Sequence, residues 1–192
     1  MAHKKGKLFI FSAPSGSGKS TIIRHLIAMP ELRLELSISA TTRPPRGEEK
    51  HGVEYYFISA DEFKHAIEQD LFAEYQEVYE GRFYGTLKSE LERIMDKGNN
   101  VALDIDVLGG INVKKLYGDR ALSMFIMPPS LEELERRLVS RNTDSAQDIA
   151  NRLAKAEYEL SFAECFDVQI INDDLTLAVE QARDSIMQFM NS

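Results

Sequence analysis

Residues 12–21 read "SAPSGSGKST" and follow directly after the apolar run "KLFIF" at residues 7–11. The pattern Ala13-x-x-x-x-Gly18-Lys19-Ser20 is that of a phosphate-binding loop, with alanine at the first position where the strict pattern has glycine. The flanking residues predict a strand before the loop and a helix after it, which is the context that such a loop requires. Glycines let backbone N–H groups approach an anion, and the start of the helix adds a positive dipole end. The stretch therefore predicts an α/β fold that holds the phosphates of a nucleoside triphosphate.

Two side chains of this loop have a specific expected task. We expect Lys19 to reach the β- and γ-phosphates and the Ser20 hydroxyl to ligate Mg²⁺. The alternative is an ordinary strand-to-helix turn with a surface lysine, and the ordered match of glycines, lysine and serine makes it the weaker interpretation. The residues expected at the triphosphate site are Ala13, Pro14, Ser15, Gly16, Ser17, Gly18, Lys19, Ser20 and Thr21.

The composition is that of a globular protein with an acidic balance. The 192 residues carry a net charge of −8, with 43% hydrophobic and 28% charged residues. This charge argues against a protein that coats nucleic acid, and no apolar run approaches the roughly 20 residues of a membrane span. The start "MAHKKGK" is not typical of a signal peptide, and the single Cys165 excludes an internal disulfide. We therefore expect a cytoplasmic protein without a nucleic-acid or membrane partner; whether it forms a homo-oligomer is left open.

Short apolar runs alternate with longer helical segments along the chain. This alternation predicts a parallel sheet flanked by helices. Strands buried on both faces are expected at 7–11, 100–106, 121–127 and 166–172, and helices at 18–28, 87–97, 131–139, 146–162 and 175–190. Residues 36–86 differ in texture and predict a small mixed α+β insertion that contains a hairpin at 72–85. The expected division is a core of residues 1–35 and 87–192, with a helical lid at about 138–152, and the insertion at 36–86.

A second anion site is expected in the segment "SISATTRPPRGEE" at residues 37–49. Arg43 and Arg46 flank two prolines that stiffen the backbone between them. Two guanidinium groups held in this way suit a phosphate dianion, whereas the alternative is a solvated loop with two surface arginines. A switch-type GTPase is disfavoured because no "NKxD"-type base-reading motif follows a later strand. The pairing of two phosphate sites points instead to a kinase of small substrates.

Five motifs occur in an order that resembles guanylate kinase. They are "SAPSGSGKST", "SISATTRPPRGEE", "HGVEYYFIS", "FAEYQEVYEGRFYGT" and "ALDIDVLGG", and the resemblance covers residues 7–190. It implies that ATP and GMP are the substrates, with Mg²⁺ as the metal, and that GMP, and dGMP with it, accepts the γ-phosphate. The implied GMP-binding residues are Arg43, Arg46, Tyr55 and Tyr84 for the phosphate, and Glu74, Ser39, Asp106 and Thr86 at or near the base. Guanine offers two adjacent donors, N1–H and the 2-amino group, which a carboxylate such as Glu74 can accept together.

The resemblance also assigns residues in the second half of the chain. Arg141 and Arg152 match arginines of a lid that closes over the transferring phosphate, while Arg137 and Asn172 match residues near the adenine. Asp104 shares a strand face with Asp106 and is expected to help to position hydrated Mg²⁺. The residues expected to act in catalysis are Lys19, Arg43, Arg141 and Arg152.

Two other functions remain as alternatives at this point. The guanylate kinase fold also occurs as a protein-interaction domain without catalysis, but this chain keeps Lys19 and Ser20. A related kinase could act on a phosphorylated sugar such as ribose bisphosphate. The presence of Glu74, Ser39 and paired tyrosines favours an acceptor that carries a base.

Overall fold

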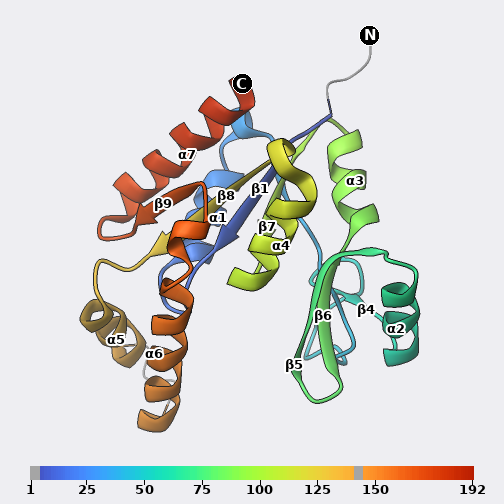
Figure 1. Ribbon diagram of the computed structural model, residues 1–192, viewed down its shortest axis with the longest axis horizontal. Helices are drawn as coiled ribbons and strands as arrows, with labels where there is room; N and C mark the ends of the chain where they lie inside the picture. The colour runs from blue at the N-terminus through green and yellow to red at the C-terminus, as the bar shows by residue number, and fades with distance from the viewer. Residues whose placement is uncertain (1–4, 141–144) are drawn as a thin grey trace.

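The main sheet has five strands, and every pairing between them is parallel. A computed structural model describes residues 5–140 and 145–192 (Figure 1). The strands in spatial order are β2 (Leu34–Leu36), β7 (Asn100–Asp104), β1 (Leu8–Ser12), β8 (Ala121–Met127) and β9 (Val168–Ile171). The predicted α/β fold with a parallel sheet is confirmed.

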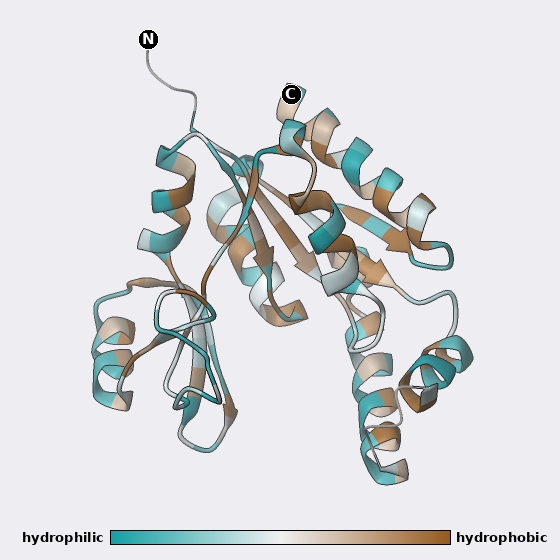
Figure 2. Ribbon diagram, turned by 180° about the vertical axis from the view of Figure 1, so that it is seen from behind, coloured by the Kyte–Doolittle hydropathy of each residue, from teal (hydrophilic) through white to brown (hydrophobic). Residues whose placement is uncertain are grey.

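Helices cover both faces of this sheet, because its central strands are apolar on both sides. Leu8 and Ile10 of β1 contribute to the core on one face, and Phe9 and Phe11 to the core on the other. Figure 2 shows the hydrophobic colouring concentrated on these central strands. The helices packed on the Phe9 face are α1 (Lys19–Ile27) and α7 (Leu175–Asn191), and those on the Leu8 face are α3 (Lys88–Asp96) and α4 (Val107–Tyr117).

A second, smaller sheet lies within the region that the sequence marks as an insertion. Its spatial order is β4 (Tyr56–Phe57), β3 (Ala40–Thr41), β6 (Arg82–Leu87) and β5 (Phe72–Tyr79), and helix α2 (Ala60–Glu68) covers it. Phe63 of α2 stacks on Phe72 with ring centroids 4.3 Å apart, and Ala40 and Ala66 complete this small core. The small sheet therefore has a hydrophobic core of its own. The proposed limits of the insertion, 36–86, stay a prediction.

Helices α5 (Leu131–Ser140) and α6 (Ala146–Leu160) pack against each other through Leu134, Leu138 and Ala156. In Figure 1 this helix pair and the small sheet extend from the same end of the main sheet, on opposite sides. The chain also forms the short 3-10 helices η1 (Pro30–Leu32), η2 (Gly118–Arg120) and η3 (Ala163–Cys165). Arg141 lies outside the described residues, and the lid at about 138–152 remains a prediction.

Three of the strands and α-helices differ from the sequence expectation. Strand β2 was not predicted because its three residues are too few to show a pattern. Helix α4 was not predicted because it contains Gly109 and Gly110, which weaken the helical signal. Strand β9 was expected to be buried on both faces, but it forms the edge of the sheet, and Gln169 and Ile171 are exposed. In the described parts of the chain, no helix is both long and apolar enough to cross a membrane.

Candidate functional site

The glycine-rich loop connects the end of β1 at Ser12 to the start of α1 at Lys19. Gly16 and Gly18 adopt φ angles of 96° and 90°, in the left-handed region that favours glycine. A Cβ on Gly16 would lie 2.9 Å from a methyl group of Leu134, and a Cβ on Gly18 would collide with the amide of Asn172. Both glycines are therefore required by conformation and by space. Ala13 does not adopt a positive φ, so its methyl group brings no backbone strain.

The loop borders a cavity of about 410 Å³. Ser17 is the one predicted loop residue that does not line it: its side chain is fully buried, and its hydroxyl has no hydrogen-bond partner in the described structure. The cavity is lined by Ala13, Pro14, Ser15, Gly16, Gly18, Lys19, Ser20, Thr21, Asp104, Ile105, Asp106, Lys155 and Glu159. The structure thus brings the remaining loop residues together around one space at the start of a helix, where an anion is favoured.

Lys19 is held at the floor of this cavity by the neighbouring strand. Its Nζ atom lies 2.6 Å from Oδ1 of Asp104 and donates to the Ile105 carbonyl at 3.1 Å. Asp104 can reach Lys19 because β7 pairs with β1, so that Asp104 lies beside Phe11. Ser20 lines the same cavity, so a hydroxyl and a carboxylate oxygen face one space. Oxygen ligands of this kind suit Mg²⁺.

The residues that could hold a metal are few. Over residues 5–140 and 145–192, no group of three or more His, Cys, Asp or Glu side chains could hold a metal ion. Magnesium usually binds through one or two protein groups together with substrate phosphates and water. Ser20 and Asp104 therefore fit a Mg²⁺ that arrives with a triphosphate, rather than one held by the protein alone.

A second cavity of about 250 Å³ lies between the small sheet and the end of β7. It is lined by Ser39, Tyr55, Glu74, Gln76, Val78, Tyr84, Gly85, Asp104, Ile105 and Asp106. Residues Asp104, Ile105 and Asp106 line both cavities and so form a shared wall. Ligands at the C-terminal end of β7 would therefore lie side by side, which is where open α/β sheets bind them.

The second cavity is lined by a half-buried carboxylate, Glu74. Glu74 and Thr86 are paired across β5 and β6, and the Thr86 hydroxyl donates to Glu74 Oε1 at 2.7 Å. Burial raises the pKa of Glu74 to about 7, and the nearby negative charge of Asp106 adds to this effect, while the Thr86 hydrogen bond opposes it. Asp106 itself caps helix α4 by accepting from the Gly109 N–H at 2.8 Å. The two carboxylate oxygens of Glu74 are thus held in place at the cavity wall and can accept from two adjacent donors.

Two tyrosines and an arginine lie close together in the small sheet region. The ring centroids of Tyr55 and Tyr84 lie 6.0 Å apart. The Arg43 guanidinium carbon lies 5.2 Å from the Tyr55 ring centroid, and only 6% of Arg43 is exposed. Arg43 donates through both Nη atoms to Glu49, at 2.8 and 3.1 Å, which raises the pKa of Arg43 above its usual value. The Arg46 N–H donates to the same carboxylate at 2.7 Å. Arg43, Tyr55 and Tyr84 are therefore brought together, and Arg46 lies exposed beside them.

The residues predicted near the adenine, Arg137 and Asn172, are joined to the glycine-rich loop by hydrogen bonds. The Asn172 amide donates to the Ser17 carbonyl at 2.7 Å, and Arg137 donates to the Asn172 carbonyl at 2.9 Å and to Glu133 at 2.7 Å. Neither Arg137 nor Asn172 lines the loop cavity. Of the two predicted lid arginines, Arg152 donates to the Ser15 hydroxyl at 2.9 Å, whereas Arg141 lies outside the described residues.

Comparison with known proteins places the whole chain in one group. A sequence model of guanylate kinases matches residues 5–189. The chain belongs to the guanylate kinase family. It is 59% identical to a guanylate kinase of Bacteroides fragilis, over 98% of this chain and 93% of that protein, and 55% identical to one of Porphyromonas gingivalis, over 96% and 98%. A crystal structure of guanylate kinase from Anaplasma phagocytophilum superposes with a TM-score of 0.73 at 31% identity, covering 96% of this chain and 86% of that one. The resemblance seen in the motifs is confirmed.

The structure adds residues around the two cavities that sequence reasoning missed. Lys155 and Glu159 line the loop cavity, three and seven positions after Arg152 on α6, so helical spacing from Arg152 could have identified them. Gln76 and Val78 line the second cavity because they alternate with Glu74 on β5 and so share its face. Burial raises the pKa of Glu159, which lines the loop cavity together with Lys155.

Proposed function

We propose that this guanylate kinase family member transfers the γ-phosphate of ATP to GMP, giving ADP and GDP. One observation carries the proposal: a triphosphate-type cavity and a cavity with a guanine-type carboxylate share the wall Asp104, Ile105 and Asp106. Donor and acceptor phosphates bound there face each other, and positioning supplies most of the catalysis in phosphoryl transfer. We place this reaction of purine nucleotide metabolism in the cytoplasm, where ATP and GMP are available.

Selection of the base rests on Glu74. The ionised, half-buried carboxylate of Glu74 accepts both N1–H and the 2-amino group of guanine, with Ser39 as a further contact. Adenine has an acceptor at N1 and no 2-amino group, so it would leave a buried carboxylate unpaired, which enzymes penalise strongly. The proposed contacts are to base and phosphate and not to the 2′-hydroxyl, so dGMP is included as a second acceptor.

The phosphates are held from opposite sides. Arg43, Arg46, Tyr55 and Tyr84 bind the acceptor phosphate, which is already an anion and needs no general base. On the donor side, Lys19 exchanges Asp104 for the β- and γ-phosphate oxygens, and the loop N–H groups stabilise the charge that develops. Arg152, already at the loop through Ser15, is joined by Arg141 when both substrates are bound.

The proposed metal is Mg²⁺, bound through the Ser20 hydroxyl and, by way of water, through Asp104. When bound, Mg²⁺ neutralises charge on the β- and γ-phosphates. The exchange of Lys19 from Asp104 to the phosphates would leave the Asp104 carboxylate available to those water molecules.

The proposal is tested by coupled ADP release with ATP and Mg²⁺ against GMP, dGMP, AMP, CMP, UMP and ribose bisphosphate. We expect turnover with GMP and dGMP alone. Lys19→Ala should lower turnover by at least about a hundredfold, since it removes a charge that acts on the transferring group. Turnover with ribose bisphosphate alone would reassign the acceptor cavity. A protein that binds GMP without turning over any acceptor would instead be a binding module.

A further inference from the structure

A buried carboxylate, Glu90, lies where the chain returns from the small sheet to the core. Strand β6 ends at Leu87, and Glu90 is in the first turn of α3. Its side chain is only 2% exposed. Leu91 and Ile94 of the same helix belong to the core of the main sheet, so Glu90 lies beside an apolar core. A charged side chain is rarely buried to this degree unless it is fully paired.

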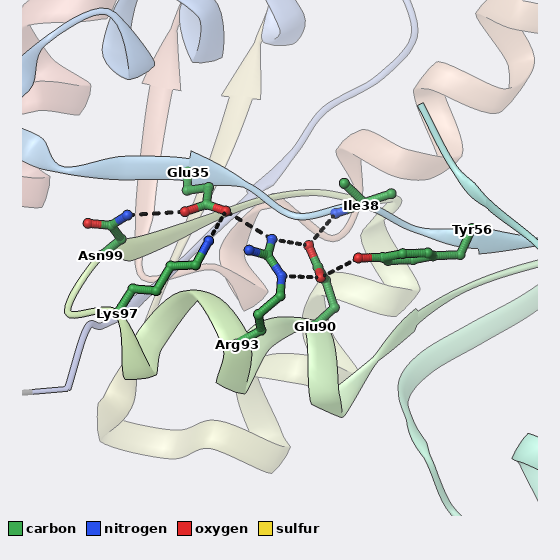
Figure 3. Close-up of polar contacts among 7 residues, drawn as sticks. All are labelled: Glu35, Ile38, Tyr56, Glu90, Arg93, Lys97 and Asn99. Carbon is green, nitrogen blue, oxygen red and sulfur yellow. Dashed lines mark hydrogen bonds and ion pairs between the residues drawn. The ribbon is translucent and has the colours of Figure 1, made fainter. Parts of the chain in front are cut away.

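The Glu90 carboxylate has four hydrogen-bond donors around it (Figure 3). Arg93 donates from Nε and Nη2, each at 2.8 Å. The Tyr56 hydroxyl donates at 2.9 Å and the Ile38 N–H at 3.2 Å. Burial opposes ionisation, but the hydrogen bonds from Arg93, Tyr56 and Ile38 outweigh it and hold the pKa of Glu90 below its usual value.

Two of these donors belong to the acceptor-binding part of the protein. Ile38 lies in the connection between β2 and β3 and precedes Ser39, while Tyr56 lies in β4 and follows Tyr55. The Tyr56 N–H also donates to the Ser39 carbonyl at 2.9 Å. Both of these donors are therefore one residue away from a proposed GMP contact. The chain passes between the two sheets twice, before β3 and after β6. Ile38 lies in the first connection and Glu90 follows the second, so the hydrogen bond between them joins the two connections.

Within the described residues, the opposite side of the cluster is attached to the core. Arg93 also pairs with Glu35 of β2 at 2.9 Å, and Glu35 accepts from Asn99 at 3.1 Å and from Lys97 at 3.4 Å (Figure 3). Arg93 is thus fixed between β2 and Glu90. The chain of contacts runs from the main sheet through Arg93 and Glu90 to the small sheet.

We propose that Glu90 is a positioning residue for the acceptor nucleotide: through Tyr56 and Ile38 it fixes the small sheet relative to the main sheet and so sets the affinity for GMP. This inference rests on the proposed function, because it assumes that GMP binds between these sheets. Loss of the contact lets the small sheet sample orientations that bind GMP less well, which raises the apparent Kd in inverse proportion to the fraction of molecules that stay correctly oriented. The donor site lies on the core and keeps its affinity for ATP.

The test compares two variants with two matched controls. Tyr56→Phe removes only the hydroxyl that reaches Glu90, and Glu90→Gln keeps the shape but removes the charge. Tyr75→Phe is the control for the first, since Tyr75 lies in the same small sheet and is 49% exposed. Glu92→Gln is the control for the second, since Glu92 lies on the same helix α3 and pairs with Lys5, outside the cluster. Calorimetric titration measures GMP binding without turnover, and steady-state kinetics give KM for GMP and ATP.

We expect Tyr56→Phe and Glu90→Gln each to raise Kd and KM for GMP about three- to tenfold, as the loss of one buried hydrogen bond implies. KM for ATP should stay within about twofold, and the double variant should be no worse than the poorer single variant. Equal GMP affinity in the variants and wild type, with only a lower Tm, would overturn the inference. Wild-type protein that binds GMP without turnover would overturn the proposed function alone, and the titrations would still decide the role of Glu90. Wild-type protein that binds no GMP would overturn both.

Discussion

At the scale of single residues, the proposed recognition of guanine by Glu74 makes GMP binding depend on pH. Only the ionised carboxylate offers two acceptors to guanine, and the pKa of Glu74 is raised to about 7 by burial and by Asp106. We expect kcat/KM for GMP to fall about tenfold per pH unit well below pH 7, measured against kcat/KM for ATP. Asp106→Asn should move the inflection to lower pH, because it removes a negative charge that opposes ionisation. An inflection that stays in place in this variant would contradict the assignment.

The same group affects stability with a definite sign. The folded-state pKa of Glu74 lies above its ordinary value of 4.5, so ionised Glu74 destabilises the fold above pH 7, and this effect disappears as pH falls from 7 to 4.5. Glu74→Gln should therefore raise Tm at pH 8 and leave it nearly unchanged at pH 4.5, while turnover of GMP is lost. Equal changes in Tm at both pH values would show that the charge is not responsible.

Glu49 is a second residue whose charge we expect to matter for GMP. Its carboxylate binds two N–H groups of the Arg43 side chain and the backbone N–H of Arg46. Glu49→Gln should free the Arg43 side chain and raise KM for GMP about three- to tenfold. The neighbouring Glu48, which is exposed, gives the matched control Glu48→Gln. A lower KM in Glu49→Gln would show instead that Glu49 competes with the substrate phosphate for Arg43.

At the scale of elements, the phosphate loop depends on the end of β9. The buried Asn172 donates to the Ser17 carbonyl and occupies the space behind Gly18. Asn172→Ala should lower the free energy of unfolding by about 1–3 kcal/mol, since it leaves a buried carbonyl unpaired. It should also raise KM for ATP severalfold without changing GMP binding. Denaturation measures the loss of stability, steady-state kinetics measure KM for ATP, and calorimetry measures GMP binding. The exposed neighbour provides the control Asp173→Ala, and an unchanged KM for ATP in Asn172→Ala would refute the bracing role.

Strands and helices that leave a clear pattern in their own sequence could be predicted. Those whose formation depends on contacts with distant residues could not. β1 and β8 are buried on both faces, which leaves continuous apolar runs in the sequence. Helix α4 contains two glycines for reasons outside the helix: a Cβ on Gly109 would lie 3.1 Å from Glu74, and one on Gly110 would lie 2.7 Å from Ser12. β2 is a strand only because β7 lies beside it.

At the scale of the whole molecule, the two halves of the site differ in how far sequence could predict them. The phosphate loop is one continuous stretch, so its pattern alone identified it. The acceptor cavity combines Ser39, Tyr84 and Asp106 from distant segments, and only the family resemblance indicated that they meet. Glu90 has no sequence signal, because its partners Ile38 and Tyr56 are 52 and 34 positions away.

The arrangement of the two proposed substrate sites predicts a change of shape on binding. The α5–α6 pair and the small sheet extend from one end of the main sheet on opposite sides, and the two cavities share a wall between them (Figure 1). Two bound substrates bring several negative charges to that wall, and the arginines on both sides gain most when they approach together. Small-angle X-ray scattering should therefore show a smaller radius of gyration with GMP and a non-hydrolysable ATP analogue together than with either alone. Lys19→Ala, which binds the triphosphate poorly, should lose this contraction. An equal radius in every liganded state would mean that the sites are already in their working positions, and that Arg152 needs no further movement to act.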